Sequence, residues 1–243
     1  MLPRAFDLIA FDGDDTLWHS ETRFSVTQAE FRELLKRHVP DADADARLSE
    51  MEMKNLSIYG YGVSSFVLSL IETAVDLTGG RVSGSQLREL IGLAKTMLTE
   101  EIELFATARD TVSGLALAYP LMLVTKGDLL HQRSKLERSG LESHFNFVEI
   151  VSHKTPAVYA AILARHGVEP GRFLMVGNSL RSDVLPVVEL GACAVHVPAE
   201  LDWSHEHVDV AAETKDQCFE LTTLAGLPAL IEQLENEARR DRR

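Results

Sequence analysis

Short apolar runs recur along the chain and, in its second half, alternate with helical patterns. Five runs have the length and composition of buried β-strands: Leu8–Phe11, Leu121–Val124, Phe147–Val151, Phe173–Val176 and Ala192–Val197. Near-continuous apolar strands separated by helices are typical of a parallel sheet that is covered on both faces. The pattern therefore predicts an α/β fold built on a parallel sheet.

The helices between the last four strands have recognisable start and stop signals. Asp128 is a candidate N-cap, and Pro156 suits the first turn of the next helix. A third helix would begin at Ser182 or Asp183 and end at Gly191. This strand–helix alternation supports the parallel sheet.

The segment between the first two strands contains no convincing strand pattern. It shows helical stripes instead, the clearest being Val67, Leu70, Ile71, Ala74 and Val75. An insert at this point would overhang the carboxyl end of the first strand, where open parallel sheets bind ligands. We therefore expect a core of residues 1–17 and 106–243 and a helical cap of residues 18–105.

The composition restricts the class of protein. The chain has 243 residues, of which 45% are hydrophobic, and this is enough for a sizeable core. The formal net charge of −13 argues against nucleic acid or an anionic membrane as the main partner. A small anionic substrate stays compatible, because it needs only local positive charge.

Cysteine content and the lack of long apolar runs predict a cytoplasmic protein. Cys193 and Cys218 form neither a disulfide framework nor a zinc motif. No apolar run approaches the ~18–20 residues that a membrane-spanning helix needs. The first residues reach a charge at Asp7 too early for a signal peptide.

Two carboxylates stand directly after the first predicted strand. Residues 11–17 read Phe-Asp-Gly-Asp-Asp-Thr-Leu, so Asp12 and Asp14 are two residues apart at the strand end. The two-residue period aims both side chains to the same side. Such charges are costly beside a core unless they are paired or metal-bound. The two carboxylates therefore predict a reactive site, in which one is a nucleophile, the other is a proton donor and acceptor, and a hard cation lies between them. The alternative is an acidic turn that closes an edge strand.

Polar residues also follow three other predicted strands. Thr125 and Lys126 supply a hydroxyl and a backbone amide ahead of a helix, where an anion would bind. Lys154 follows the third strand. After the fourth strand, Asn178 and Asp183 offer oxygen atoms of the kind that Mg²⁺ accepts. Taken singly, these residues also fit an ordinary turn, a solvated lysine and a helix N-cap.

Taken in order, these motifs resemble those of the haloacid dehalogenase-like (HAD) hydrolase superfamily, over the whole chain. The motifs are carried by Asp12-x-Asp14-x-Thr16, Thr125, Lys154, and Gly177-Asn178 with Asp183. The resemblance implies a Rossmann-like core and a helical cap between the first two motifs. It also implies a phosphatase that acts on a small phosphorylated metabolite.

The resemblance assigns a role to each motif residue. Asp12 would be the nucleophile, and Asp14 would be the general acid and base. Thr125 and Lys154 would hold the phosphate, beside the backbone amide of Lys126. Mg²⁺ would be bound by Asp12, by the backbone carbonyl of Asp14 and by the fourth motif.

Three positions depart from the family pattern. Asn178 stands where many relatives have aspartate, so the site loses one negative charge and should bind Mg²⁺ more weakly unless Asp183 compensates. Asp15 stands where glycine is common, and we expect it to stiffen the following turn. Thr155 separates the lysine and proline of the third motif, which we expect to have no effect.

We expect a Mg²⁺-dependent phosphatase that hydrolyses a small phosphomonoester through an aspartyl-phosphate intermediate. Three alternatives stay open: a phosphomutase, a non-catalytic phosphate-binding protein, which Asn178 motivates, and a metal-independent haloacid dehalogenase. Asp14 counts against the dehalogenase, because metal-free dehalogenation needs the nucleophile without an acid two residues on.

Substrate choice would fall to the cap. Ser57–Gly62 reads as a loop between cap helices, in which Tyr59 and Tyr61 would either contact the substrate or be half-buried in an ordinary turn. Trp18, His19 and Glu21 follow the catalytic strand and would line the cap entrance, although His19 fits a core or surface histidine equally well. Trp203, His205 and Glu206 follow the last predicted strand and form a further candidate rim. The favoured alternative for these three residues is a packed indole with a solvated pair.

Overall fold

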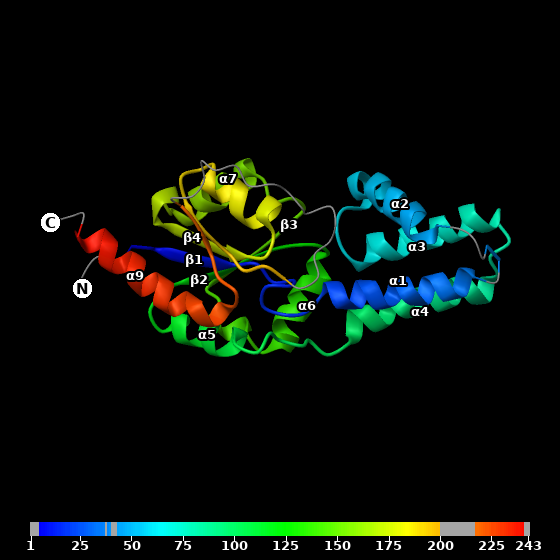
Figure 1. Cartoon of the computed structure of the whole chain (residues 1–243), viewed down its shortest axis with the longest axis horizontal. Helices are drawn as coiled ribbons and strands as arrows, with labels where there is room; N and C mark the ends of the chain where they lie inside the picture. Colours follow the sequence, from blue (N-terminus) through cyan, green and yellow to red (C-terminus); the bar gives the residue numbers. More distant parts are fainter. Residues whose placement is uncertain (1–4, 37, 40–42, 200–216, 241–243) are drawn as a thin grey trace. The chain divides into compact units, whose positions relative to one another are not determined.

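The fold is described from a computed structural model of the chain, which defines residues 5–36, 38–39, 43–199 and 217–240. The described residues form two compact units (Figure 1). The first unit is drawn from Met1–Glu21, Ile102–Thr125 and Ser134–Arg243, and the second from Thr22–Glu101 and Lys126–Arg133. The core and cap boundaries expected from the sequence stay a prediction.

A six-stranded sheet forms the centre of the first unit, in the order β3-β2-β1-β4-β5-β6. The strands are β1 (Leu8–Phe11), β2 (Leu121–Lys126), β3 (Phe147–Val151), β4 (Phe173–Gly177), β5 (Cys193–His196) and β6 (Cys218–Glu220). β1 lies inside the sheet and pairs in parallel with β2 and β4. Doubly wound sheets with this order bind ligands at the carboxyl ends of their strands. The α/β fold with a parallel, Rossmann-like sheet is confirmed.

Helices cover both faces of this sheet (Figure 1). They are α5 (Ala108–Ala116), α6 (Leu129–Ser139), α7 (Pro156–His166), α8 (Leu185–Val188) and α9 (Leu227–Arg240), with short turns η1 (Glu142–His144), η2 (Pro170–Arg172), η3 (Leu180–Val184) and η6 (Leu224–Gly226). Ile9 and Phe11 of β1 pack on the side of α5 and α9, whereas Leu8 and Ala10 pack on the side of α7. This alternation keeps both faces of β1 dry.

Two elements of the first unit differ from the expectation. The helix expected to begin at Ser182 or Asp183 is preceded by η3, a π-type turn, so Asp183 lies inside this turn and is not an N-cap. Strand β6 was not predicted, because its three residues are too short a run to give an alternation signal.

Four helices make up most of the second unit: α1 (Glu21–Leu35), α2 (Ala44–Tyr59), α3 (Val63–Thr78) and α4 (Gly84–Thr99). Phe31, Leu48, Leu70 and Leu90, one from each helix, are fully buried in its core. The expected loop Ser57–Gly62 is wrong in extent: α2 runs to Tyr59, so only residues 60–62 connect α2 and α3. None of the described helices is both long and apolar enough to span a bilayer.

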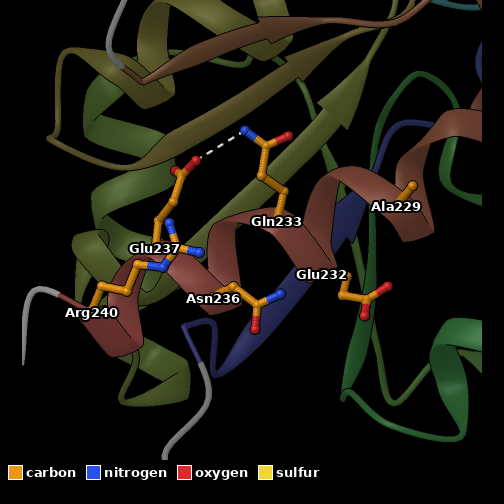
Figure 2. A pocket seen from close by; sticks show the side chains of 6 residues that line it. All are labelled: Ala229, Glu232, Gln233, Asn236, Glu237 and Arg240. Carbon is orange, nitrogen blue, oxygen red and sulfur yellow. Dashed lines mark hydrogen bonds between the residues drawn. The ribbon is translucent and has the colours of Figure 1, made fainter.

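The outer face of α9 carries a surface depression of about 340 Å³ (Figure 2). Its lining residues lie along one side of this helix and are Ala229, Glu232, Gln233, Asn236, Glu237 and Arg240. Gln233 Nε2 donates a hydrogen bond to Glu237 Oε1 at 2.9 Å. None of the predicted site residues lines this depression.

Candidate active site

Asp12 extends the central strand of the sheet by one residue. Its backbone N–H donates to the carbonyl of Val176 at 2.9 Å, which continues the pairing of β1 with β4. The residue is only 6% exposed. Thr125, near the end of the neighbouring β2, is fully buried. The first, second and fourth motifs therefore lie at the ends of adjacent strands, β1, β2 and β4.

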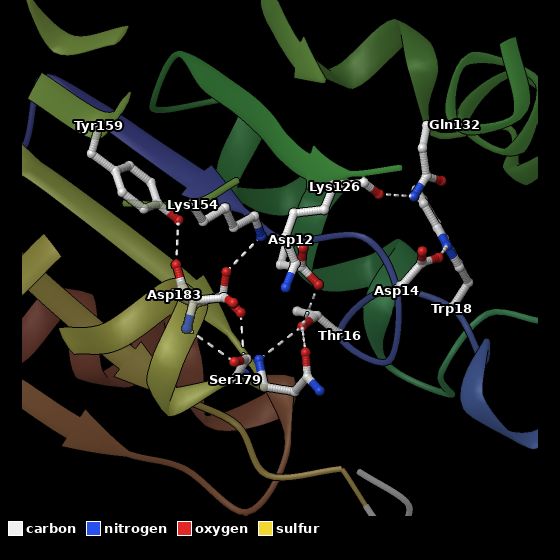
Figure 3. A network of polar contacts seen from close by, with 12 residues as sticks. Asp12, Asp14, Thr16, Trp18, Lys126, Gln132, Lys154, Tyr159, Ser179 and Asp183 are labelled. Atoms are coloured by element: carbon white, nitrogen blue, oxygen red, sulfur yellow. Dashed lines mark hydrogen bonds and ion pairs between the residues drawn. The ribbon is translucent and has the colours of Figure 1, made fainter. Parts of the chain in front are cut away.

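Lys154 joins the first motif to the fourth. It lies between β3 and α7, and its side chain is 1% exposed. Its ammonium group donates to Asp12 Oδ1 and, at 2.5 Å, to Asp183 Oδ1 (Figure 3). A lysine buried to this degree is stable only when carboxylates compensate its charge. The structure thus brings three of the predicted residues into one buried ionic cluster.

The cluster holds more negative than positive charge. When Asp12, Asp183 and Lys154 are all ionised, two carboxylates face one ammonium group. Burial raises the pKa of Asp12 to about 7; Lys154 opposes this shift, while Asp183 and Asp14 add to it. Burial alone would lower the pKa of Lys154, but the two carboxylates outweigh it and the pKa is raised. Lys154 is therefore the fixed cation of the site, and a second cation would stabilise the ionised form of Asp12.

The fourth motif folds tightly around the carboxylate of Asp183. Asp183 Oδ2 accepts the backbone N–H of Ser179 at 3.1 Å (Figure 3). A side chain at Gly177 would overlap this carboxylate, so only glycine fits at the end of β4. Since Asp183 Oδ1 accepts from Lys154, each of its carboxylate oxygens has a fixed hydrogen-bond donor.

The backbone of Asn178 is held at both its N–H and its carbonyl. The N–H donates to Thr16 Oγ1 at 3.0 Å, and the carbonyl accepts from His196 Nε2 at 2.9 Å. His196 therefore carries a proton on Nε2. The hydroxyl of Thr16 also lies 3.3 Å from Asn178 Oδ1 and 3.4 Å from Asp12 Oδ2. Through Thr16, these contacts link the amide oxygen of Asn178 to the carboxylate of Asp12.

Asp14 has two donors on a single oxygen. Trp18 Nε1 and Lys135 Nζ each lie 2.6 Å from Asp14 Oδ1. Lys135 comes from α6 and also lies 3.4 Å from the hydroxyl of Ser20. Figure 3 shows the indole of Trp18 beside Asp14. Trp18 thus contacts the predicted acid and base directly, whereas its expected place at a cap entrance stays a prediction.

The remaining predicted residues are placed as follows. Lys126, Tyr59 and Tyr61 belong to the second unit. There the ammonium group of Lys126 lies 4.3 Å from the centre of the Tyr61 ring. In the first unit, the ring of His19 stacks on Phe105 with a centroid distance of 3.9 Å. The candidate rim after the last predicted strand, Trp203, His205 and Glu206, lies outside the described residues.

Three residues of this site were not predicted as members of it: Thr16, Lys135 and His196. Thr16 was visible in the first motif, but its link to Asn178 depends on how β1 and β4 end. Lys135 is a single lysine within a helix, and His196 is a single histidine at a strand end. Neither carries a sequence signal that distinguishes it from a surface residue.

The donor set fits a magnesium ion. Asp12, Asn178 and Asp183 contribute carboxylate and amide oxygens, the ligands that Mg²⁺ prefers, and no soft ligand lies among them. The buried cluster also has an excess negative charge and a raised pKa at Asp12, as expected of a site that is completed by a cation. The groups that would hold the ion are Asp12, Asn178 and Asp183, with the backbone carbonyl of Asp14.

Comparison with known proteins identifies the family. The sequence model of the haloacid dehalogenase-like hydrolases matches residues 6–191. The chain belongs to the haloacid dehalogenase-like hydrolases. A crystal structure of a haloacid dehalogenase-like family hydrolase from Xanthomonas campestris shares 35% sequence identity, with a TM-score of 0.87 over 98% of this chain and 100% of that one. The resemblance seen in the sequence is confirmed.

Two curated relatives of this HAD hydrolase are phosphatases. Glyceraldehyde 3-phosphate phosphatase from Pyrococcus furiosus is 25% identical over 96% of this chain and 95% of its own length. N-acylneuraminate-9-phosphatase from Homo sapiens is 25% identical over 46% of this chain. The match spans about half of the human protein, 48% of its length.

Proposed function

We propose that this HAD hydrolase is a Mg²⁺-dependent phosphatase that hydrolyses a small phosphomonoester through an aspartyl-phosphate intermediate. One observation carries the proposal: the buried carboxylate of Asp12 is paired with Lys154 at the end of β1, and Asp14 follows two residues later. An aspartate attacks an anionic phosphate only when positive charge offsets the repulsion. Lys154 supplies that charge at the reacting oxygen.

The residues divide the reaction between them. Asp12 attacks phosphorus and forms an acyl phosphate, while Asp14 gives a proton to the leaving oxygen. Asp14, now a carboxylate, takes a proton from the water that hydrolyses the acyl phosphate, and Asp12 is regenerated. Lys154 stabilises charge on the equatorial phosphate oxygens, and Thr125 and the amide of Lys126 bind the same group. Bound Mg²⁺ would supply further neutralisation of charge between the phosphate and Asp12.

The relatives and the overall charge support a small phosphorylated metabolite as substrate. The two curated relatives are named for phosphatase activity on glyceraldehyde 3-phosphate and on N-acylneuraminate 9-phosphate. A net charge of −13 disfavours nucleic acid and anionic membranes as partners. Asp14 disfavours dehalogenation, because its proton-transfer role has no counterpart in metal-free cleavage of a carbon–halogen bond.

Phosphate release from p-nitrophenyl phosphate tests the proposal. Wild type should release phosphate with Mg²⁺ and stop in excess EDTA, and Asp12→Asn should lose essentially all turnover while keeping a cooperative thermal transition. Halide release from 2-chloropropionate in EDTA would contradict the proposal in favour of a dehalogenase. Transfer of the phosphoryl group to an added sugar phosphate in preference to water would indicate a mutase. No turnover of any phosphate would indicate a binding protein.

A further inference from the structure

We propose that Lys135 and the indole N–H of Trp18 are positioning groups that orient the carboxylate of Asp14 for proton transfer to the leaving group. The inference rests on the proposed phosphatase activity, in which Asp14 is the acid and base. Its basis is the convergence of two donors, each 2.6 Å from the same oxygen, Asp14 Oδ1.

The burial of Lys135 shows that this contact is specific. Its side chain is 9% exposed, although lysine is one of the residues least often buried. Among the described residues, Asp14 is the carboxylate that pairs with it. Holding a long side chain in one conformation costs entropy, and desolvating its charge costs more. Asp14 therefore holds Lys135 in place: its Oδ1 accepts the hydrogen bond of Lys135 in either protonation state, and its carboxylate form also compensates the charge.

The second donor is held rigidly by the turn that follows β1. Trp18 is fully buried, and a side chain at Gly13 would overlap its indole ring. The carbonyl of Trp18 accepts the N–H of Asp15 at 2.8 Å. The same turn therefore carries both the acid and one of its two donors, and it places them without a loop that could move independently.

Because both donors bind Oδ1, the two oxygens of Asp14 have different roles. Oδ1 accepts hydrogen bonds, so proton exchange with the leaving group and with water falls to Oδ2. A carboxylic acid that is protonated on Oδ2 still accepts through Oδ1. Lys135 and Trp18 can therefore hold the same orientation in both halves of the reaction. Positioning of this kind supports the acid's contribution to the rate, which is typically about 10²–10⁴-fold.

Substrates with different leaving groups can show whether Lys135 positions the acid or only stabilises the fold. Nitrophenolate departs without a proton, whereas an alkoxide needs one. The kcat/KM value reports the steps up to the first irreversible one, formation of the acyl phosphate, so it isolates the acid's role. We compare Lys135→Met, which removes the charge, with Lys135→Arg, which keeps it, on p-nitrophenyl phosphate and on glycerol 2-phosphate with Mg²⁺.

Lys135→Met should lower kcat/KM about 10²-fold for glycerol 2-phosphate and less than about fivefold for p-nitrophenyl phosphate. Lys135→Arg should restore most of the loss. Ser20→Ala, which removes only the 3.4 Å contact to Lys135, is the matched control and should change neither value by more than about twofold. Trp18→Phe removes the second donor and keeps an aromatic ring, so it should show the same dependence on the leaving group if Lys135→Met does not fold.

Two results would overturn the inference alone. One is an equal loss on both substrates for the folded variants, and the other is no loss on either. A wild-type protein that hydrolyses neither substrate would instead refute the proposed phosphatase, so the two failures are distinguishable.

Discussion

The negative charge that the site would present to the proposed Mg²⁺ ion depends on the side chain at position 178, which is the neutral amide of Asn178. Its amide oxygen is oriented by Thr16 and, through its backbone, by His196, in a position where a carboxylate would add a negative charge. The buried cluster of Asp12, Lys154 and Asp183 already has an excess negative charge. In the proposed magnesium site, the amide would therefore lower the electrostatic cost of the metal-free protein and would also lower the affinity for Mg²⁺.

Asn178→Asp should consequently bind Mg²⁺ about tenfold more tightly, which corresponds to about 1.4 kcal/mol. The same variant should be less stable than wild type without metal, because it adds a carboxylate to a negative cluster. Mg²⁺ titrations of phosphatase activity measure the first effect, and thermal unfolding with and without Mg²⁺ measures the second. An unchanged Mg²⁺ affinity in a folded variant would show that Asn178 does not face the ion.

At this scale the sequence predicted that Asp12, Lys154 and Asp183 belong to one site, but it predicted neither the ion pairs between them nor the residues that support them. The three residues follow strands of the same sheet, and open parallel folds bring the carboxyl ends of their strands to one edge. Lys135 and His196 reach the site through the packing of α6 and the exact end of β5. Such contacts between distant segments leave no periodic signal in the chain.

Among the elements, the connection between α2 and α3 is the one to which we assign substrate choice. Tyr61 lies in this connection, and the ammonium group of Lys126 lies over its ring in a cation–π contact. Tyr61→Ala should lower kcat/KM for the preferred metabolite roughly 5–150-fold, because one lost contact costs ~1–3 kcal/mol. Tyr59→Ala should act in the same direction. Both variants should affect a small aryl phosphate much less.

Tyr61→Phe is the matched control, because it keeps the ring under Lys126 and removes only the hydroxyl. Kinetics on both substrates separate recognition from folding. Equal losses on large and small substrates would mean that Tyr59, at the end of α2, and Tyr61, in the connection, support the fold and do not recognise the substrate.

Helix α2 also contains a carboxylate whose ionisation opposes folding. Burial raises the pKa of Glu52 from 4.5 to about 7. The folded chain therefore binds more protons than the unfolded chain between about pH 4.5 and 7, and stability falls as the pH rises through this window. Glu52→Gln should raise the melting temperature by several degrees at pH 8 and by little at pH 5.

The exposed Glu50 on the same helix provides the control for this pH effect. Its side chain is 66% exposed and pairs with Arg47, so Glu50→Gln should change stability by less than about 1 kcal/mol. Melting curves from pH 4.5 to 8 measure the difference. A stabilisation by Glu52→Gln that is independent of pH would contradict this account.

The elements that the sequence missed have weak patterns for physical reasons. A helix was expected before Ser57, but no apolar stripe was recognised in it. The reason is that α2 buries Ala44, Leu48 and Asn55, and one of these is polar. Strand β6 is short and half-exposed. By contrast, β1 and β4 are buried on every residue, and their apolar runs were recognised with nearly correct bounds.

At the scale of the whole first unit, the side chain of Glu235 forms hydrogen bonds with segments that are far apart in the sequence. This residue of α9 is 5% exposed, and its Oε1 accepts from the backbone N–H of Ala5 at 2.7 Å and from the hydroxyl of Tyr119 at 2.9 Å. The start of β1, the start of β2 and the C-terminal helix thus share one acceptor. These hydrogen bonds join α9 to the segments that lead into β1 and β2.

Glu235→Ala should therefore lower the free energy of unfolding by about 1–3 kcal/mol, since it removes the acceptor that two part-buried donors share. Tyr119→Phe removes one donor and should cost less. Glu232→Ala, on the exposed face of the same helix, should change stability by less than about 0.5 kcal/mol. Urea unfolding measures all three variants. A loss for Glu232→Ala equal to that for Glu235→Ala would refute the role of the shared acceptor.

The central claim, covalent phosphoryl transfer to Asp12, is tested most directly by trapping the intermediate. Asp14→Asn should still accept a phosphoryl group from p-nitrophenyl phosphate with Mg²⁺, because nitrophenolate leaves unaided, but should hydrolyse the acyl phosphate slowly. Acid quenching followed by borohydride reduction and peptide mass mapping should then locate one modified residue, Asp12. An unmodified Asp12 while wild type turns over the same substrate, or a label on another residue, would contradict the account.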